Sequence, residues 1–252
     1  MPRTNLVIGA NRGIGLGLVE ELVKKHSTDV VYATARVPAE AAELQEIAKK
    51  SDGRVIIVQL DMVDQASIDA AAAEIAKSTE TLDEVIVNGG AALGVSAIED
   101  VSAEDFSRNL DINVVGPHRV IKAFVPFLKR SKAPRRVLAI TSSAGGSLGF
   151  ADQIWDMTKT ATGQDFSPAS AYFATKTAVN GLIRQWGLRL EGDGIPVVAI
   201  HPGLVDTDMA KGMPGAIPIA DSAAGFIAVV DELDPSKIKE GILSYDGSIV
   251  PW

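Results

Sequence analysis

The chain has 252 residues, 46% of them hydrophobic and 22% charged, with a net charge of −8 and a pI near 5.0. Its Lys and Arg are scattered, so no broad positive field can hold a phosphate backbone, and we exclude nucleic acid as a partner. The absence of cysteine excludes disulfides and thiolate metal sites and favours a reducing compartment, for which we predict the cytoplasm. Neither a separate signal segment nor a bilayer-length apolar run is visible, so we expect neither secretion nor a membrane span.

Short β-branched apolar runs alternate along the chain with segments of helical periodicity. Such alternation predicts a mostly parallel sheet of about seven strands with helices on both faces, in a single α/β doubly wound domain over residues 1–252. Two polar stretches, 145–169 and 204–220, are predicted as long loops. Ser102 with Asp105 resembles a capping box. The predicted strands are 6–8, 30–32, 55–58, 85–87, 137–140 and 197–200, and the predicted helices are 16–25, 39–50, 68–77, 106–128 and 171–190.

A glycine-rich loop follows the first predicted strand, with Gly9, Gly13 and Gly15 in the spacing G-x-x-x-G-x-G. Glycine permits a sharp turn and brings backbone N–H groups close to a pyrophosphate at a helix N-terminus. A dinucleotide fits this loop, and the alternative is a tight turn that binds nothing. A P-loop is excluded, because Leu16-Gly17 stands where Lys and Ser/Thr would be needed.

Arg36 ends the second predicted strand, where an enzyme that uses NAD would carry an acidic side chain. A guanidinium at that place can pair with a 2′-phosphate, so we predict NADPH/NADP as the cofactor, with Arg12 as a second clamp. The alternative for either arginine is an ordinary solvated cation. The lack of an acid at this position also argues against a nucleotide-binding methyltransferase.

Tyr172 and Lys176 open the helical segment 171–190 and lie one turn apart on the same face. A nearby ammonium stabilises a phenolate and brings the phenol pKa toward neutrality, so Tyr172 can act as a proton donor to a carbonyl oxygen. The alternative is a core tyrosine with a surface lysine.

Taken together, these residues resemble the short-chain dehydrogenase/reductase family over nearly the whole chain. Further family elements occur in order at Asp61, Asn88, Asn113, Ser142 and Pro202-Gly203. The resemblance implies a Rossmann-type fold and an oxidoreductase in which Ser142 orients the carbonyl, Tyr172 is the acid, Lys176 binds the nicotinamide ribose and lowers the Tyr172 pKa, and Asn113 supports a proton-relay water. The predicted cofactor-binding residues are Gly9, Asn11, Arg12, Gly13, Ile14, Gly15, Arg36, Asp61, Met62, Asn88, Gly89, Tyr172, Lys176, Pro202, Gly203, Val205 and Thr207.

The sequence departs from the family pattern in three places. Ile8 stands where many members have a threonine that steadies the glycine loop, and Asn88-Gly89-Gly90-Ala91 replaces Asn-Asn-Ala-Gly. The long separation between Ser142 and Tyr172 leaves Ser143 as the alternative serine. The ending 243–252 is similar to the branch of carbonyl reductases that includes norsolorinic-acid ketoreductase.

The expected activity is NADPH-dependent reduction of a ketone or aldehyde, and the alternative is a catalytically idle NADP-binding sensor or partner protein. We expect no metal site, because His26, His118 and His201 are widely separated. The family resemblance suggests a homo-oligomer, a dimer or tetramer. Apolar side chains in the two long loops indicate a bulky apolar carbonyl substrate or, alternatively, mere packing: Phe150, Ile154, Trp155, Met157, Phe166, Met209, Met213 and Ile217.

Overall fold

The computed structural model describes residues 2–164, 167 and 169–252. In this part of the chain the strands form one eight-stranded sheet in the order β3-β2-β1-β4-β5-β6-β7-β8, in which only β7 and β8 pair antiparallel. The strands are β1 Thr4–Ile8, β2 Val30–Ala35, β3 Val55–Gln59, β4 Glu84–Val87, β5 Val137–Thr141, β6 Val197–His201, β7 Gly241–Ser244 and β8 Ile249–Pro251.

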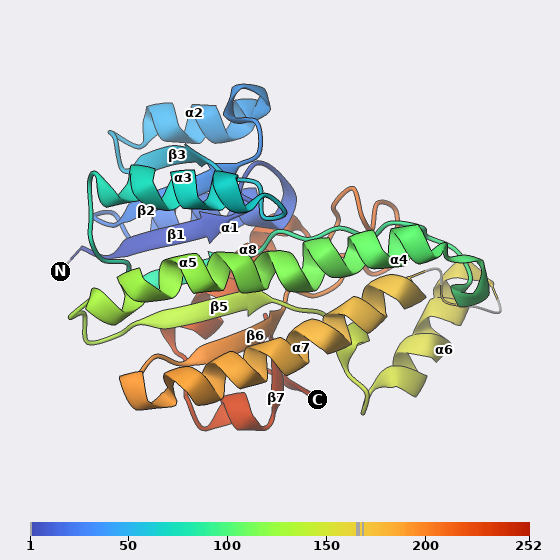
Figure 1. Ribbon diagram of the computed structural model, residues 1–252. Helices are drawn as coiled ribbons and strands as arrows, with labels where there is room; N and C mark the ends of the chain where they lie inside the picture. The colour runs from blue at the N-terminus through green and yellow to red at the C-terminus, as the bar shows by residue number, and fades with distance from the viewer. Residues whose placement is uncertain (1, 165–166, 168) are drawn as a thin grey trace.

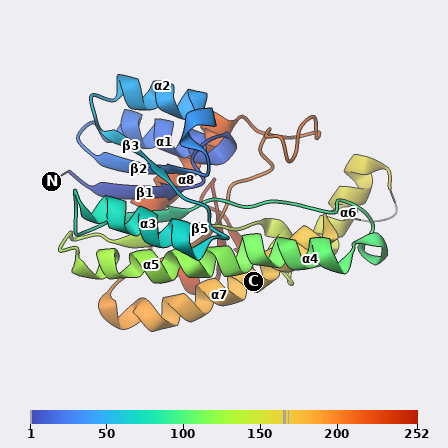
Figure 2. The same cartoon turned by 45° about the horizontal axis from the view of Figure 1, so that its top comes forward.

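Helices cover both faces of the sheet (Figures 1 and 2). Apolar side chains of α3, α5 and α7 form one core cluster against it, and those of α1, α2 and α8 form the cluster on the opposite face. The helices are α1 Gly13–Lys25, α2 Ala42–Lys50, α3 Gln65–Ala76, α4 Ala103–Leu110, α5 Gly116–Arg130, α6 Ala151–Thr162, α7 Ser170–Leu190 and α8 Ile219–Asp231.

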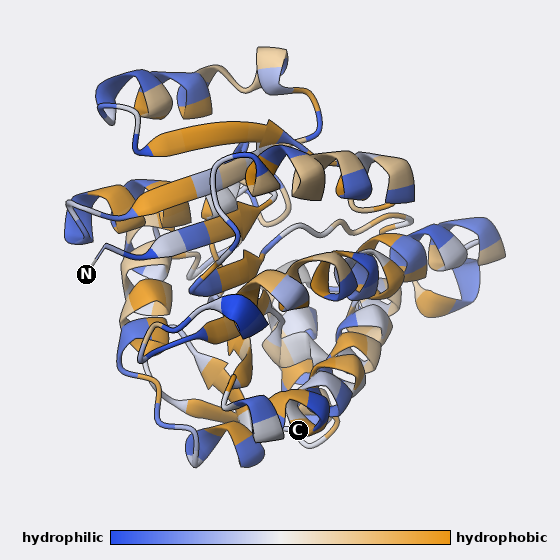
Figure 3. Ribbon diagram, turned by 60° about the vertical axis from the view of Figure 1, so that its left-hand side comes forward, coloured by the Kyte–Doolittle hydropathy of each residue, from blue (hydrophilic) through white to orange (hydrophobic). Residues whose placement is uncertain are grey.

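The central strands β4 and β5 are buried along their whole length. A parallel strand with helices on both faces has no solvent side, which explains the largely apolar sequence of both strands. Figure 3 shows the consequence, with apolar strands in the middle and polar residues on the outer sides of the helices. The chain thus forms a single α/β Rossmann-like domain.

The six predicted strands and the general positions of the five predicted helices are confirmed, with four corrections. Residues 145–169 are not a continuous loop, because they contain α6, and α8 starts inside the predicted loop 204–220. The sheet has eight strands rather than about seven, because the chain turns after β7 and returns as β8. The predicted helix 106–128 is interrupted by a π-helical turn at Asp111–Val115.

The π-helical turn has a local cause in the sequence. Pro117 has no N–H and its ring would crowd the carbonyl four residues earlier, at Asn113, so the regular ladder cannot continue there. The N–H of Gly116 instead donates to the carbonyl of Asp111, five residues back. The interruption lies beside the end of the sheet that carries the candidate site.

The strand order reverses direction between β1 and β4, which are neighbours although β2 and β3 lie between them in sequence. The connections after these strands leave in opposite directions and open a crevice at their carboxyl ends, where doubly wound proteins bind ligands. Gly9 follows β1 and Asn88 follows β4, so both stand at this crevice.

Candidate active site

The glycine turn after β1 is tightly packed against the segment after β4. Gly9 has φ +77°, a conformation that side chains disfavour, and a Cβ added there would lie 2.9 Å from the Cα of Gly89. A Cβ on Gly15 would collide with the carbonyl oxygen of Gly9. These two glycines are required by the close approach of backbone to backbone at the crevice.

Side chains from neighbouring strands hold this turn in place. The N–H of Gly9 donates to Thr34 Oγ1 at 3.0 Å, and Asn88 Nδ2 donates to the Gly9 carbonyl at 3.3 Å. Thr141 in turn donates to Asn88 Oδ1 at 3.1 Å. Thr34 thus supplies the hydroxyl that Ile8 lacks. Sequence analysis did not select Thr34; a threonine inside the largely apolar strand Val30–Ala35 marks an unusual position but does not reveal its partner.

The N-terminus of α1 opens into a cavity of about 820 Å³ at the crevice. Its N-cap residue, Arg12, makes no side-chain cap, and the first turn of the helix contains no acidic residue. Asn11, Arg12, Gly13 and Ile14 all line the cavity. Uncapped backbone N–H groups at a positive helix end form a site suited to an anion such as a pyrophosphate.

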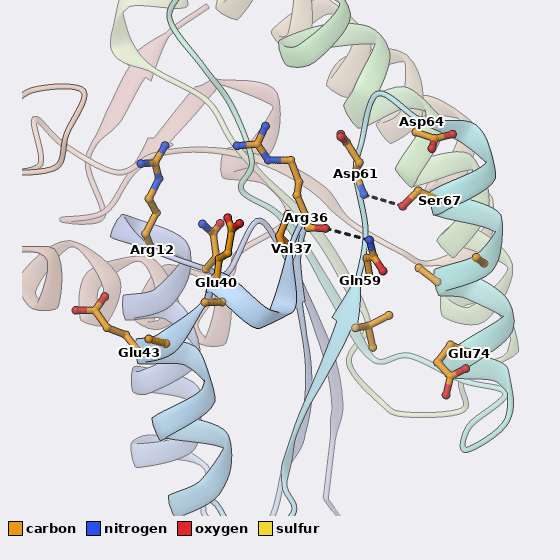
Figure 4. A pocket seen from close by; sticks show the side chains of 16 residues that line it. Arg12, Arg36, Val37, Glu40, Glu43, Gln59, Asp61, Asp64, Ser67 and Glu74 are labelled. Atoms are coloured by element: carbon orange, nitrogen blue, oxygen red, sulfur yellow. Dashed lines mark hydrogen bonds between the residues drawn. The ribbon is translucent and has the colours of Figure 1, made fainter.

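A second hollow of about 1030 Å³ adjoins this cavity and shares Asn11, Arg12, Arg36, Glu43 and Asp61 with it. Figure 4 shows the side chains of Arg12 and Arg36 on the same side of the hollow. Arg12 Nη1 pairs with Asp208 at 2.9 Å, whereas no ion pair to Arg36 is recorded in the described part of the chain. Arg36 is therefore the cation available to a phosphate here.

Tyr172 and Lys176 stand in the first two turns of α7 and line the cavity, as sequence analysis predicted. Lys176 is 3% exposed, and its Nζ donates to the Thr141 carbonyl at 2.8 Å. The same Nζ lies 5.5 Å from the centroid of the Tyr172 ring. The ammonium therefore sits beneath the ring, at the end of β5.

Burial governs the pKa of both groups. Burial lowers the pKa of Lys176 to about 8 and raises the pKa of Tyr172 above its ordinary value. The direction for Tyr172 is opposite to the sequence-based expectation, because Lys176 donates to a backbone carbonyl while desolvation dominates at the phenol. A phenol with a raised pKa carries its proton at neutral pH, as a proton donor must.

Ser142 lines the cavity directly after β5, and its Oγ donates to Asn180 Oδ1 at 2.5 Å. Among the described lining residues Ser143 does not occur, and its hydroxyl caps the following turn by accepting from the N–H of Gly145 at 3.1 Å. The geometry therefore favours Ser142 over the alternative Ser143. Sequence analysis did not identify Asn180.

Asn113 is brought near the site but does not line the cavity in the described residues. Its Oδ1 accepts from the N–H of Ala91 at 2.9 Å, and its Nδ2 donates to the Ala91 carbonyl at 2.8 Å and to Thr175 at 3.0 Å. The side chain thus ties the segment after β4 to α7. Asn109, one turn earlier, holds Leu93 in the same way and was also missed.

The cavity brings together most of the predicted site residues. Three further predicted residues are not among its described lining: Gly15, packed against the glycine turn, Gly203 with φ +88° against Tyr245, and Val205, buried and bridged to Ile217. The predicted residues that line it are Gly9, Asn11, Arg12, Gly13, Ile14, Arg36, Asp61, Met62, Asn88, Gly89, Ser142, Tyr172, Lys176, Pro202 and Thr207.

The apolar residues predicted for the substrate side are only partly at the cavity. Met209 lines it, but α6 holds Trp155 and Met157 at 40% and 61% exposure, outside the described lining. Phe166 lies outside the described residues. Other apolar parts of the cavity wall come from Met62, a predicted cofactor-binding residue, and from Ile112 and Ile219, which sequence analysis did not select.

The three histidines lie in separate environments. His26 contacts Asp231 at 3.0 Å, and the His118 ring lies 5.7 Å from that of Trp186. Burial lowers the pKa of His201 to about 4. Among the described residues no cluster of three metal-ligating side chains occurs, and no helix there is long and apolar enough to cross a membrane.

Known proteins resemble this chain along its whole length. Residues 9–244 match a family model described as enoyl-(acyl carrier protein) reductase. The short chain dehydrogenase gsfK of Penicillium aethiopicum is 33% identical and covers 100% of both chains. An uncharacterized oxidoreductase of Schizosaccharomyces pombe is 32% identical over 98% of this chain and 96% of that protein. The structure of NADPH-bound carbonyl reductase from chicken fatty liver has a TM-score of 0.88 and 31% identity, covering 100% of this chain and 99% of that one. The chain belongs to the short-chain dehydrogenase/reductase family of oxidoreductases.

Proposed function

We propose that the protein is a carbonyl reductase that uses NADPH to reduce a ketone or aldehyde to an alcohol. The observation that carries this proposal is one cavity that joins the glycine turn and the N-terminus of α1 to Ser142, Tyr172 and Lys176. An anion-binding turn and a half-buried proton donor in the same space are what hydride transfer followed by protonation requires.

The residues of the cavity fit a phosphorylated dinucleotide. The uncapped N-terminus of α1 suits the pyrophosphate, and Gly9 and Gly89 leave backbone where a side chain would otherwise fill the space. Arg36, at the end of β2, suits the additional phosphate that distinguishes NADPH from NADH. The NADPH-bound chicken carbonyl reductase, similar over its whole chain, supports the same choice.

When bound, NADPH supplies the hydride, and the chain's own residues handle the proton and the geometry. Tyr172 carries its proton at neutral pH, as a phenol of ordinary pKa already does, and burial raises its pKa further; it donates that proton to the developing alkoxide. Lys176, held by the Thr141 carbonyl, would offer its remaining N–H groups to the cofactor ribose and its charge to the phenol. Ser142 and the rigid turn after β4 limit where the carbonyl can lie.

A bulky apolar substrate, a cytoplasmic location and a dimer or tetramer stay predictions. The cavity wall offers Met62, Ile112 and Met209 to an apolar substrate, beside the charged Asp111 and Lys211. This mixture supports a carbonyl compound with both an apolar body and polar groups.

A Tyr172→Phe variant tests the proposal together with a panel of ketones and aldehydes. We expect wild type to oxidise NADPH with at least one compound, and the variant to lose about 10²- to 10⁴-fold in kcat, because only the proton donor is removed. NADPH binding, followed by fluorescence, should be nearly unchanged. A variant that keeps more than about a tenth of the wild-type kcat contradicts the role of Tyr172. Absence of turnover across the panel, with NADPH bound, would favour the idle NADP-binding protein instead.

A further inference from the structure

Asn180 occupies a position on α7 that the reaction described above does not use. It follows Lys176 by four residues, as Lys176 follows Tyr172, so the three side chains lie along one face of the helix. Asn180 is 5% exposed, and a buried amide must have each of its polar atoms satisfied. Its partners therefore define what it does.

The orientation of the Asn180 amide is fixed by Gly146. Asn180 Nδ2 donates to the Gly146 carbonyl at 3.1 Å, and a carbonyl oxygen can only accept. The amide oxygen must then face Ser142, whose Oγ lies 2.5 Å away. Because Oδ1 also can only accept, the hydroxyl proton of Ser142 points at Asn180.

This arrangement determines what Ser142 offers to the cavity. A hydroxyl has one proton and two lone pairs, and the proton of Ser142 is already engaged at its back. Its lone pairs remain for the cavity, where Tyr172 also lies. Ser142 in this geometry accepts a hydrogen bond from a hydroxyl in the cavity and leaves Tyr172 as the donor to the carbonyl oxygen.

We propose that Asn180 is a positioning residue that sets the direction of the Ser142 hydrogen bond and anchors the turn at Gly146 from which the segment containing α6 departs. This inference rests on the proposed reductase function and refines the role expected of Ser142, which was to orient the carbonyl. Asn180 itself does not line the cavity among the described residues, so it acts through Ser142.

A double-mutant cycle between Asn180 and Ser142 tests the inference. Asn180→Leu keeps the volume but removes the acceptor, and we expect kcat to fall about tenfold, the size of one neutral hydrogen bond, with little change in KM for NADPH. In a Ser142→Ala background the same substitution should have almost no further effect on kcat, because the group that it positions is gone. If Asn180→Leu lowers kcat by the same factor in the wild-type and the Ser142→Ala backgrounds, the inference is overturned.

The Asn180→Asp variant keeps the inference testable if Asn180→Leu fails to fold. A protonated aspartic acid accepts from Ser142 and donates to Gly146, so this variant should retain more kcat than Asn180→Leu, most clearly at acidic pH. Equal kcat losses in the two variants at all pH values would also overturn the inference. Asn5→Leu is the matched control, since Asn5 is equally buried at the other end of the sheet and should affect stability but not kcat. Failure of wild type to reduce any carbonyl would instead overturn the proposed function.

Discussion

The two ends of the sheet each bury an ionisable side chain, but they surround it differently. At the carboxyl end Lys176 is 3% exposed and contacts a neutral carbonyl, with no ion pair recorded among the described residues. At the amino end Glu84, 2% exposed, lies 3.8 Å from Arg3. Arg3 also pairs with Asp29 at 3.1 Å and with Asp231 at 3.0 Å.

The difference indicates which end is built to receive a ligand. At the amino end the buried Glu84 has the guanidinium of Arg3 within 3.8 Å, so its charge is partly compensated within the chain. Lys176 bears the cost of burial without a carboxylate, and burial lowers its pKa to about 8. A buried ammonium without a carboxylate partner is stabilised most by a ligand that binds from outside the chain. Ionisable groups with shifted pKa values are concentrated at functional sites.

The largest effect should come from removing the uncompensated charge. We expect Lys176→Met to lower kcat/KM about a hundredfold or more, because contacts to both the cofactor ribose and the phenol are lost, each of the strength of a charged hydrogen bond. Stability should stay equal or rise, since no buried ammonium is left to desolvate. Steady-state kinetics and thermal unfolding measure the two quantities.

The pH dependence of kcat/KM in the Lys176→Met variant tests the role of the Lys176 charge further. If the ammonium is the active form, the wild-type kcat/KM falls as pH rises through about 8, where Lys176 loses its proton. The variant should lack this descending limb. A limb that persists unchanged in Lys176→Met would assign it to another group.

Arg36 should show the next largest effect, on cofactor preference. Arg36→Ala is expected to lower kcat/KM for NADPH by about ten- to a hundredfold and to leave the value for NADH almost unchanged, because only NADPH carries the phosphate. Arg36→Asp should begin to invert the preference. Arg12→Ala is the comparison variant and should lower kcat/KM for NADPH less, since Arg12 already forms an ion pair with Asp208. Equal losses for both cofactors would make Arg36 a general surface cation.

The smallest effect concerns stability at the amino end. Burial raises the pKa of Glu84 from 4.5 to about 7, although Arg3 opposes the shift. The folded state therefore holds a proton that the unfolded state releases, and wild-type stability should fall as pH rises from about 4.5 through about 7. Glu84→Gln removes this slope and leaves kcat unchanged. Urea unfolding across that pH range measures this dependence of stability on pH. If the stabilities of wild type and Glu84→Gln change with pH in parallel, Glu84 is not the cause.

Local patterns predicted the elements and the motif residues, because they depend on neighbours in sequence. The strand around Val31 and the pair Tyr172 and Lys176 are of this kind. The contacts of Thr34, Asn180 and Asp208 were not predictable, since each joins segments at least 25 residues apart and depends on packing. Helix α6 was missed because it buries no residue in the described set and so has little apolar pattern, although Gly163, with φ +68°, marks its end.

The short strand β8 has a consequence for how copies of the protein can meet. An outer strand exposes unpaired N–H and C=O groups that invite another sheet to add to it. Here that strand has three residues, Pro251 has no N–H to offer, and the next carbonyl, of Trp252, accepts from the N–H of Gly149 at 3.0 Å. The β8 margin of the sheet is thereby protected against the addition of a strand from another copy.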